Sequence, residues 1–112
     1  MYQYEYYTTK RGKQPVRDWI GELPLRERAV MWDKIQKLCE EGLKLLRTNM
    51  LTPIEGYSAD FYELRGGKLR IGVYLDRPKN MFILLHGWRK KRRRQPRDIG
   101  IAYNRLIDYL QD

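Results

Sequence analysis

The chain has 112 residues, of which 42% are hydrophobic, and its formal net charge is +9. This length and this hydrophobic content suit one domain with a buried core and exclude wholesale disorder. One cysteine excludes an internal disulfide and a cysteine-rich zinc site, and with one histidine as well we expect no metal and no other cofactor.

The excess of positive charge concerns the partners of the protein rather than its fold. A polyanion is the natural ligand, because a phosphate backbone releases counterions when cations bind to it. The sequence begins without a signal-peptide pattern, and no apolar run has the length of a membrane span. We therefore expect a cytoplasmic protein that binds nucleic acid and has no membrane partner.

The first half of the chain predicts a strand and two helices. Residues 2–9 are rich in aromatic and β-branched types, which favours a strand. A short helix over residues 15–23 begins at a proline, and a longer one covers about residues 25–41, so the two form a helical hairpin. The expected apolar stripe of the longer helix consists of Leu25, Ala29, Trp32, Ile35 and Cys39. We predict a loop with one helical turn over residues 43–57.

The second half predicts three strands and a final helix. The strands cover residues 60–65, 68–75 and 81–86, and the short turns between them indicate an antiparallel meander. The helix covers residues 96 to about 110. The predicted fold class is α+β, with all strands in one sheet, the helices mainly on one face of it, and a single domain spanning residues 1–112.

The middle strand of the meander has two faces of different character, because side chains alternate along a strand. The face expected to pack on the helices carries Leu69, Ile71, Val73 and Leu75. The opposite face carries Arg70, Gly72 and Tyr74, and the glycine leaves room for a ligand or another backbone. Arg70 is either a cation projecting from the sheet into a site or an ordinary arginine paired with Glu63 on the neighbouring strand.

The last predicted strand ends in the only histidine, His86, and six cations follow Trp88. These cations are Arg89, Lys90, Lys91, Arg92, Arg93 and Arg94. Such runs also occur as localisation signals or unspecific polyanion patches, but this one lies between a strand and a helix, which favours the edge of a site. Together with Arg65 and Arg70, it could form one basic face, although the sequence does not fix the strand register.

A basic face with a histidine contains the groups that RNA cleavage without a metal requires. A base removes the proton of a ribose 2′-hydroxyl, cations stabilise the phosphorane, and an acid protonates the leaving 5′-oxygen. Histidine suits proton transfer near neutral pH, and the planar guanidinium of arginine binds phosphate through two hydrogen bonds. A lone histidine at the end of a strand is more often structural or merely exposed than catalytic.

The order of several short motifs resembles the RelE/ParE toxin superfamily, and most closely the HigB-like and phage-derived toxins of bacterial type II toxin–antitoxin systems. The motifs are Glu63-Leu64-Arg65, Leu69-Arg70-Ile71, residues 84–91, and Gln95-Pro96 before a helix that carries Ala102. The resemblance extends from the helix at Pro15 to the C-terminus. It implies a compact α+β fold and metal-independent cleavage of mRNA in the ribosomal A site.

The resemblance also implies roles for individual residues. Arg70 corresponds to the sheet arginine that contacts phosphate or the transition state, and Arg65 corresponds to the arginine of the Glu-Leu-Arg strand. Phe61 and Glu63 occupy positions where some RelE-type enzymes carry catalytic lysines, so the general base stays open between His86 and Lys90. The predicted catalytic residues are Arg65, Arg70, His86 and Lys90. The predicted RNA-binding residues are Arg89, Lys91, Arg92, Arg93 and Arg94.

Three functions are compatible with these observations. The first is a ribosome-dependent mRNA endoribonuclease toxin that inhibits translation. Its partners would be the ribosome, mRNA and a cognate antitoxin, expected to be a helix-turn-helix protein whose acidic segment folds over the basic face. The second is a ParE-like inhibitor of DNA gyrase, and the third is a catalytically inactive, phage-derived nucleic-acid-binding protein. Membership of a fold family does not decide among them.

Overall fold

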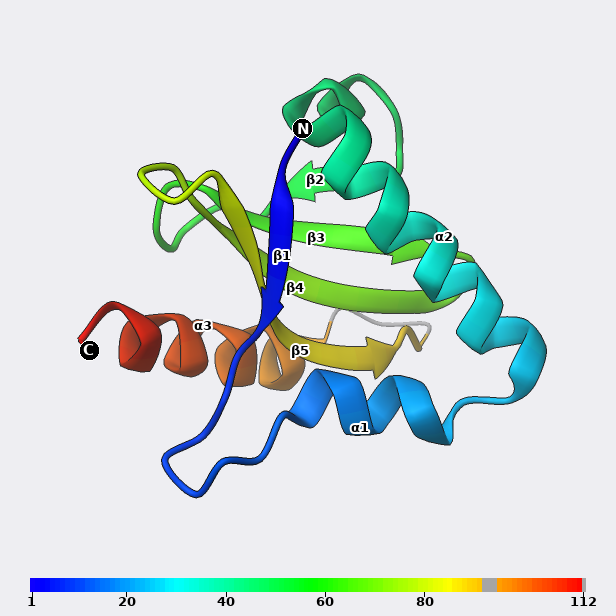
Figure 1. Ribbon diagram of the computed structural model, residues 1–112, viewed down its shortest axis with the longest axis horizontal. Coiled ribbons are helices and arrows are strands. Elements are labelled where there is room, and N and C mark those ends of the chain that lie inside the picture. Colours follow the sequence, from blue (N-terminus) through cyan, green and yellow to red (C-terminus); the bar gives the residue numbers. More distant parts are fainter. Residues whose placement is uncertain (92–94, 112) are drawn as a thin grey trace.

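The computed structural model describes residues 1–91 and 95–111, and the strands in this part of the chain form a five-stranded sheet (Figure 1). The strands are β1 (Gln3–Tyr6), β2 (Leu51–Pro53), β3 (Phe61–Gly66), β4 (Leu69–Asp76) and β5 (Met81–Arg89). Their order across the sheet is β1-β5-β4-β3-β2. β1 runs parallel to β5, and the other neighbours are antiparallel, so the predicted meander is confirmed.

The helices agree closely with the predicted ranges. They are α1 (Pro15–Glu22), α2 (Leu25–Glu41) and α3 (Pro96–Leu110). α1 and α3 each begin at a proline, which is tolerated there because the first N–H groups of a helix have no partner within it. The predicted helical turn within residues 43–57 corresponds to the 3-10 helix η1 (Gly42–Arg47), but the prediction is wrong in part because it omits the strand β2. Leu51 of β2 pairs with Leu64 of β3.

One face of the sheet packs against α1 and α2. The four inward residues predicted for β4 are buried in this core: Leu69, Ile71, Val73 and Leu75. The helix α2 contributes Met31, Ile35 and Leu38 to it. Of the predicted stripe on α2, Ile35 is buried and Cys39 is half-buried, but the prediction is wrong at Leu25, which is 78% exposed, and at Ala29 and Trp32, which are also exposed.

The helix α3 packs on the opposite face, which the expectation of helices mainly on one face did not include. Ala102 and Leu106 are buried there against a second apolar cluster. The sheet and the segment after β1 contribute Tyr7, Phe61, Ile83 and Leu85 to this cluster. At Gly72 of β4, a Cβ atom would lie 2.8 Å from the Cβ atom of Ala102. The room that we predicted beside Gly72, for a ligand or for another backbone, is thus occupied by α3.

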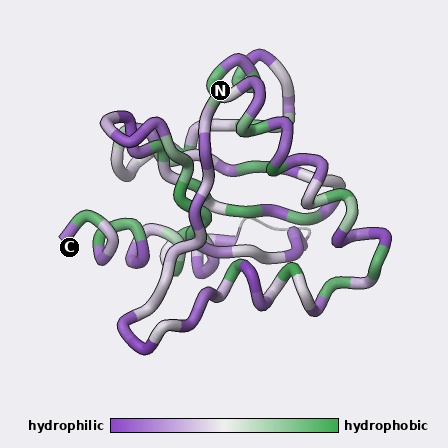
Figure 2. The backbone as a smooth tube through the Cα atoms, viewed as in Figure 1, coloured by the Kyte–Doolittle hydropathy of each residue, from purple (hydrophilic) through white to green (hydrophobic). Residues whose placement is uncertain are grey.

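The position of the N-terminus and the hydropathy along the backbone agree with this arrangement of helices and strands. The N-terminus lies beside the end of α2, where the backbone N–H of Tyr2 donates to the carbonyl oxygen of Cys39 at 2.7 Å (Figure 1). Figure 2 shows apolar segments along the central strands and a hydrophilic connection between β1 and α1. Within the described ranges, we find no helix with both the length and the apolar character needed to cross a membrane.

Candidate nucleic-acid site on the sheet face

The face of the sheet that carries α3 has an apolar half and a polar half. α3 crosses the sheet over Gly72 and covers the apolar half. The strand register aligns Glu63, Gly72 and His86 in one row, and it aligns Arg65, Arg70 and Trp88 in the next. Paired residues on neighbouring strands project from the same face. We call Glu63, Arg65, Arg70, His86 and Trp88 the polar half of the sheet face.

The two sheet arginines lie side by side and share one carboxylate. Nε of Arg65 donates to Oε2 of Glu63 at 2.9 Å, and Nε of Arg70 lies 3.6 Å from the same oxygen. Nη1 of Arg70 donates to the carbonyl oxygens of Gly67, at 2.6 Å, and Leu69, at 2.9 Å. Arg70 is only 7% exposed, and its Nε makes no hydrogen bond to any described residue. The pairing of Arg70 with Glu63 that we considered is therefore present, but it is long.

Burial and the neighbouring charges act on Arg70 in different directions. Burial lowers the pKa of its guanidinium, the carboxylate of Glu63 opposes that shift, and the charge of Arg65 adds to it. Arginine nevertheless stays charged in proteins. Arg65 and Arg70 line a cavity of about 440 Å³, together with Lys34, and its described lining contains no acidic residue. Three cations around one cavity suit a phosphate group.

A β-bulge in β5 directs His86 to the α3 face. Gly72 pairs with His86, whereas the next residue, Val73, pairs with Leu84, so Leu85 is an extra residue in β5. A bulge of this kind places two consecutive side chains on the same side of a strand. Without it, alternation from the buried Leu85 would direct His86 towards α1 and α2.

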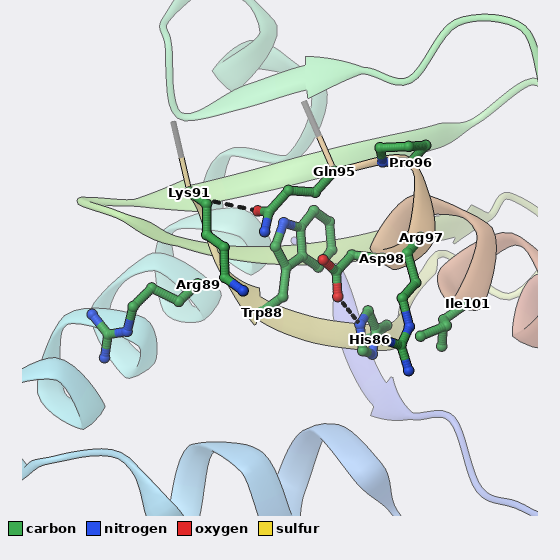
Figure 3. A pocket seen from close by; sticks show the side chains of 9 residues that line it. All are labelled: His86, Trp88, Arg89, Lys91, Gln95, Pro96, Arg97, Asp98 and Ile101. Carbon is green, nitrogen blue, oxygen red and sulfur yellow. Dashed lines mark hydrogen bonds and ion pairs between the residues drawn. The ribbon is translucent and has the colours of Figure 1, made fainter. Parts of the chain in front are cut away.

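Both ring nitrogens of His86 are engaged by α3. Nε2 lies 2.9 Å from Oδ1 of Asp98 (Figure 3), and Nδ1 lies 3.3 Å from Nη1 of Arg105. Because a guanidinium only donates, Nδ1 accepts, and the proton of the neutral ring is on Nε2, which donates to Asp98. Burial lowers the pKa of His86, the hydrogen bond to Asp98 opposes the shift, and the charge of Arg105 adds to it. The neutral imidazole is therefore the favoured form.

A second cavity, of about 550 Å³, lies between β5 and the start of α3 (Figure 3). His86 and Trp88 form part of its wall, and their rings are stacked with centroids 5.5 Å apart and planes inclined by 17°. Arg65 and Arg70 do not line this cavity. The structure therefore brings Arg65 and Arg70 together and places His86 on the same sheet face but in a different cavity.

The predicted cationic run separates into residues with different environments. Arg89 forms a two-bond ion pair with Glu27 of α2, at 2.7 and 2.5 Å, and points away from His86 (Figure 3). The backbone N–H of Lys90 donates to the carbonyl oxygen of Lys68 at 2.7 Å, and Lys90 is exposed. Lys91 is exposed beside the second cavity. Arg92, Arg93 and Arg94 lie outside the described residues.

Four residues of the site were not among the sequence-based candidates: Lys34, Trp88, Asp98 and Arg105. Trp88 follows His86 by two positions, so the alternation of a strand places it on the same face. Asp98 and Arg105 are seven positions apart on one helix, a spacing of about two turns that puts both on the side facing His86. Those spacings were visible in the sequence. Within the described part of the chain, no group of three or more His, Cys, Asp or Glu side chains is placed to hold a metal ion.

Comparison with known protein families gives a decisive match. The model of the family described as "Phage derived protein Gp49-like (DUF891)" matches residues 18–106 of the chain. The chain belongs to this family. The matched range contains both the arginine pair and the network around His86 in this Gp49-like chain. A comparison with curated protein sequences finds no significant match.

One solved structure is similar to this chain in fold. It is a chain of the toxin–antitoxin complex RelBE2 from Mycobacterium tuberculosis, with a TM-score of 0.51 and 18% sequence identity. The match covers 80% of the Gp49-like chain and 98% of that chain. The predicted resemblance to the RelE/ParE superfamily and the predicted α+β fold are thereby confirmed.

Proposed function

We propose that this Gp49-like chain is the toxin of a type II toxin–antitoxin system and that it inhibits translation as a ribosome-dependent mRNA endoribonuclease. The observation that carries the proposal is the pair Arg65 and Arg70, which are neighbours on the polar half of the sheet face and line one cavity together with Lys34 of α2. The fold likeness to a chain of a toxin–antitoxin complex supports it. The net charge of +9 supports a polyanionic substrate.

The scissile phosphate would bind in the cavity that Arg65, Arg70 and Lys34 line. Arg65 would exchange its bond to Glu63 for bonds to phosphate oxygens, and the fork of a guanidinium matches two such oxygens. Arg70 is already held by two backbone carbonyls, so it needs little reorganisation when charge develops on the phosphorane. No step of this reaction requires a metal.

Proton transfer is the part of the mechanism that involves His86 and Lys90. His86 would accept the 2′-hydroxyl proton only after one of its bonds to α3 opens, because both ring nitrogens are engaged. Lys90 is exposed at the end of β5, and its ammonium group is a proton donor for the leaving 5′-oxygen. Lys91, Arg92, Arg93 and Arg94 would bind the RNA backbone. An acidic segment of the antitoxin would cover these cations in the cytoplasm until the toxin is released.

The test is a reconstituted translation reaction in which the ends of the mRNA are mapped. We expect the wild-type protein to cut the message only on translating ribosomes, Arg70→Ala to abolish the cuts, and His86→Ala to reduce them. Arg26→Ala is the control, because Arg26 is an exposed arginine on α2. Intact message on active ribosomes with the wild-type protein would contradict the proposal. A supercoiling assay with DNA gyrase, run in parallel, would then test the ParE-like alternative.

A further inference from the structure

We propose that the cavity beside Trp88 is a pocket for one unpaired nucleobase of single-stranded RNA. This inference rests on the proposed function and names the part of the substrate that the cavity would take. The cavity has a volume of about 550 Å³, which lies within the range of roughly 300–1,000 Å³ typical of small-ligand sites. It therefore has room for a base together with part of its ribose.

The walls of the cavity suit a flat apolar ring. Trp88, Pro96 and Ile101 supply apolar surface from β5 and from the first turns of α3 (Figure 3). The ring of His86 stacks on the indole of Trp88 and holds it in place in the wall of the cavity. Proteins that bind single-stranded RNA commonly pack its bases against aromatic side chains, because every base has an apolar face.

Two polar groups in the wall are available to the edge of a base. Oε1 of Gln95 accepts from the backbone N–H of Lys91 at 3.1 Å, so the amide NH₂ of Gln95 faces the cavity without a partner among the described residues. Oδ1 of Asp98 accepts a hydrogen bond from His86, whereas Oδ2 accepts none from any residue that the structure describes. A donor and an acceptor on adjacent walls are the pair of groups that recognises the edge of a base.

The same carboxylate argues against a bare phosphate in this cavity. A phosphate beside Asp98 would bring two negative charges together at an apolar wall, where such repulsion is poorly screened. The cations of this region, Arg89, Lys91 and Arg97, are exposed residues that border the cavity, and Arg89 is paired with Glu27. That position suits contacts with the RNA backbone as it passes the rim.

The pocket and the proposed phosphate site adjoin the same row of the sheet. Arg65, Arg70 and Trp88 are paired positions on β3, β4 and β5. Neighbouring strands lie about 4.8 Å apart, so Arg65 and Trp88 are separated by roughly 10 Å. An extended RNA strand spans such a distance with its phosphate at the arginines and a nearby base in the pocket.

The test compares nucleotides with ribose 5-phosphate and inorganic phosphate, which lack a base, by NMR titration of the 112-residue chain. The probes are the four ribonucleoside 5′-monophosphates, ribose 5-phosphate and inorganic phosphate. We expect at least one nucleotide to shift the indole N–H signal of Trp88 and the methyl signals of Ile101. Ribose 5-phosphate and inorganic phosphate should shift the side-chain signals of Arg65 and Arg70 but leave those of the pocket unchanged. Equal shifts of the pocket signals with ribose 5-phosphate would overturn the proposal.

Two variants test the pocket separately from the arginines. We expect Gln95→Ala and Ile101→Glu each to weaken nucleotide binding about tenfold, the usual scale for one hydrogen bond or one stacked contact, while binding of ribose 5-phosphate stays unchanged. Leu110→Glu is the matched control, because Leu110 is 50% exposed at the far end of the same helix. Unchanged nucleotide affinity in both folded pocket variants would overturn the proposal.

The outcomes also separate the pocket from the proposed activity. Nucleotide-dependent shifts at Trp88, found together with intact message on ribosomes, would support the pocket and contradict the endoribonuclease. Cleaved message, found together with pocket signals that do not depend on a base, would support the endoribonuclease and overturn the pocket. The binding assay needs no cleavage, so neither result depends on the other.

Discussion

Arg65 and Arg70 face each other across β3 and β4, and one oxygen of Glu63 lies 2.9 Å from Nε of the first and 3.6 Å from Nε of the second. Like charges at paired strand positions repel each other. Glu63 therefore offsets the repulsion that would otherwise act between the arginines. Any phosphate that the arginines bind must compete with this carboxylate.

Replacing Glu63 by glutamine should affect the stability of the protein and the binding of phosphate by Arg65 and Arg70 in opposite directions. We expect Glu63→Gln to lower the free energy of unfolding by about 1 kcal/mol or less, because the ion pair is partly exposed. The same change should increase affinity for inorganic phosphate several-fold, since the competing charge is gone. Urea unfolding and a phosphate titration at low salt measure the two effects. Weaker phosphate binding by a folded variant would show that Glu63 supports an anion site rather than competing with it.

Substitutions of Arg70 test whether charge alone is sufficient at this position. Removing one preorganised donor from a transition-state site typically lowers the rate by about 10²–10³-fold. We expect a loss of that size in single-turnover cleavage with Arg70→Ala. A substantial part of the loss should remain with Arg70→Lys, because lysine keeps the charge but lacks the planar fork. Arg26→Lys is the control. Full activity of Arg70→Lys would indicate a purely electrostatic role.

Much of the fold could be predicted from the sequence, because local patterns determine it. Strand alternation gave the inward face of β4, and prolines marked the starts of α1 and α3. The missed strand β2 has only three residues and ends in Pro53, so it lacked a periodic signal. The error in α2 arose because two apolar stripes share Ile35, and the choice between them depends on tertiary packing.

The candidate site was less predictable, because its geometry depends on packing between distant segments. The pairing of Arg65 with Arg70 follows from a short turn, and both residues were candidates. The sequence did not show that α3 would pack over Gly72, because an apolar stripe does not specify which sheet face it covers. The bulge in β5 was also hidden, since the run from Ile83 to Leu85 is apolar at every position. Without these two features, the contacts of His86 could not be foreseen.

The packing of α3 on the sheet can be tested at Gly72. We expect Gly72→Ala to destabilise the protein by about 1–3 kcal/mol, because the added methyl would meet Ala102 at 2.8 Å. The double variant Gly72→Ala with Ala102→Gly should recover part of this loss, but glycine within a helix itself costs about 1 kcal/mol. Gly21→Ala is the matched control. It lies on α1 with no atom within 4 Å of the added Cβ and should stabilise the protein slightly. Thermal unfolding measures all three, and equal stability of Gly72→Ala and wild type would contradict the packing.

Arg89 and Lys91 are neighbours in the cationic run, but their environments predict different effects on RNA binding. The guanidinium of Arg89 is held by Glu27, whose hydrogen bond to it raises the pKa of Arg89. Arg89 and Lys91 both line the cavity beside Trp88, but Lys91 forms no ion pair with any residue that the structure describes. We therefore expect Lys91→Ala to reduce affinity for single-stranded RNA, and to flatten its salt dependence, more than Arg89→Ala. Filter binding over a range of salt concentrations makes the comparison, and a larger effect of Arg89→Ala would show that its ion pair opens when RNA binds.

The network around His86 predicts a dependence of stability on pH. The folded protein has a lowered pKa at His86, so the unfolded chain binds more protons between that value and the ordinary value of 6.5. The contribution of neutral His86 to the free energy of unfolding is therefore fully present above the pKa that His86 has in the unfolded chain. It is lost as the pH falls towards the lower pKa that His86 has in the folded protein. Protonation also removes the Nδ1 acceptor and places a cation beside Arg105. The difference in unfolding free energy between the wild type and His86→Gln should shrink from pH 7.5 to pH 5, as measured by urea unfolding. Acidic side chains titrate in both proteins and cancel in this difference, so parallel curves would show that His86 does not titrate across this range.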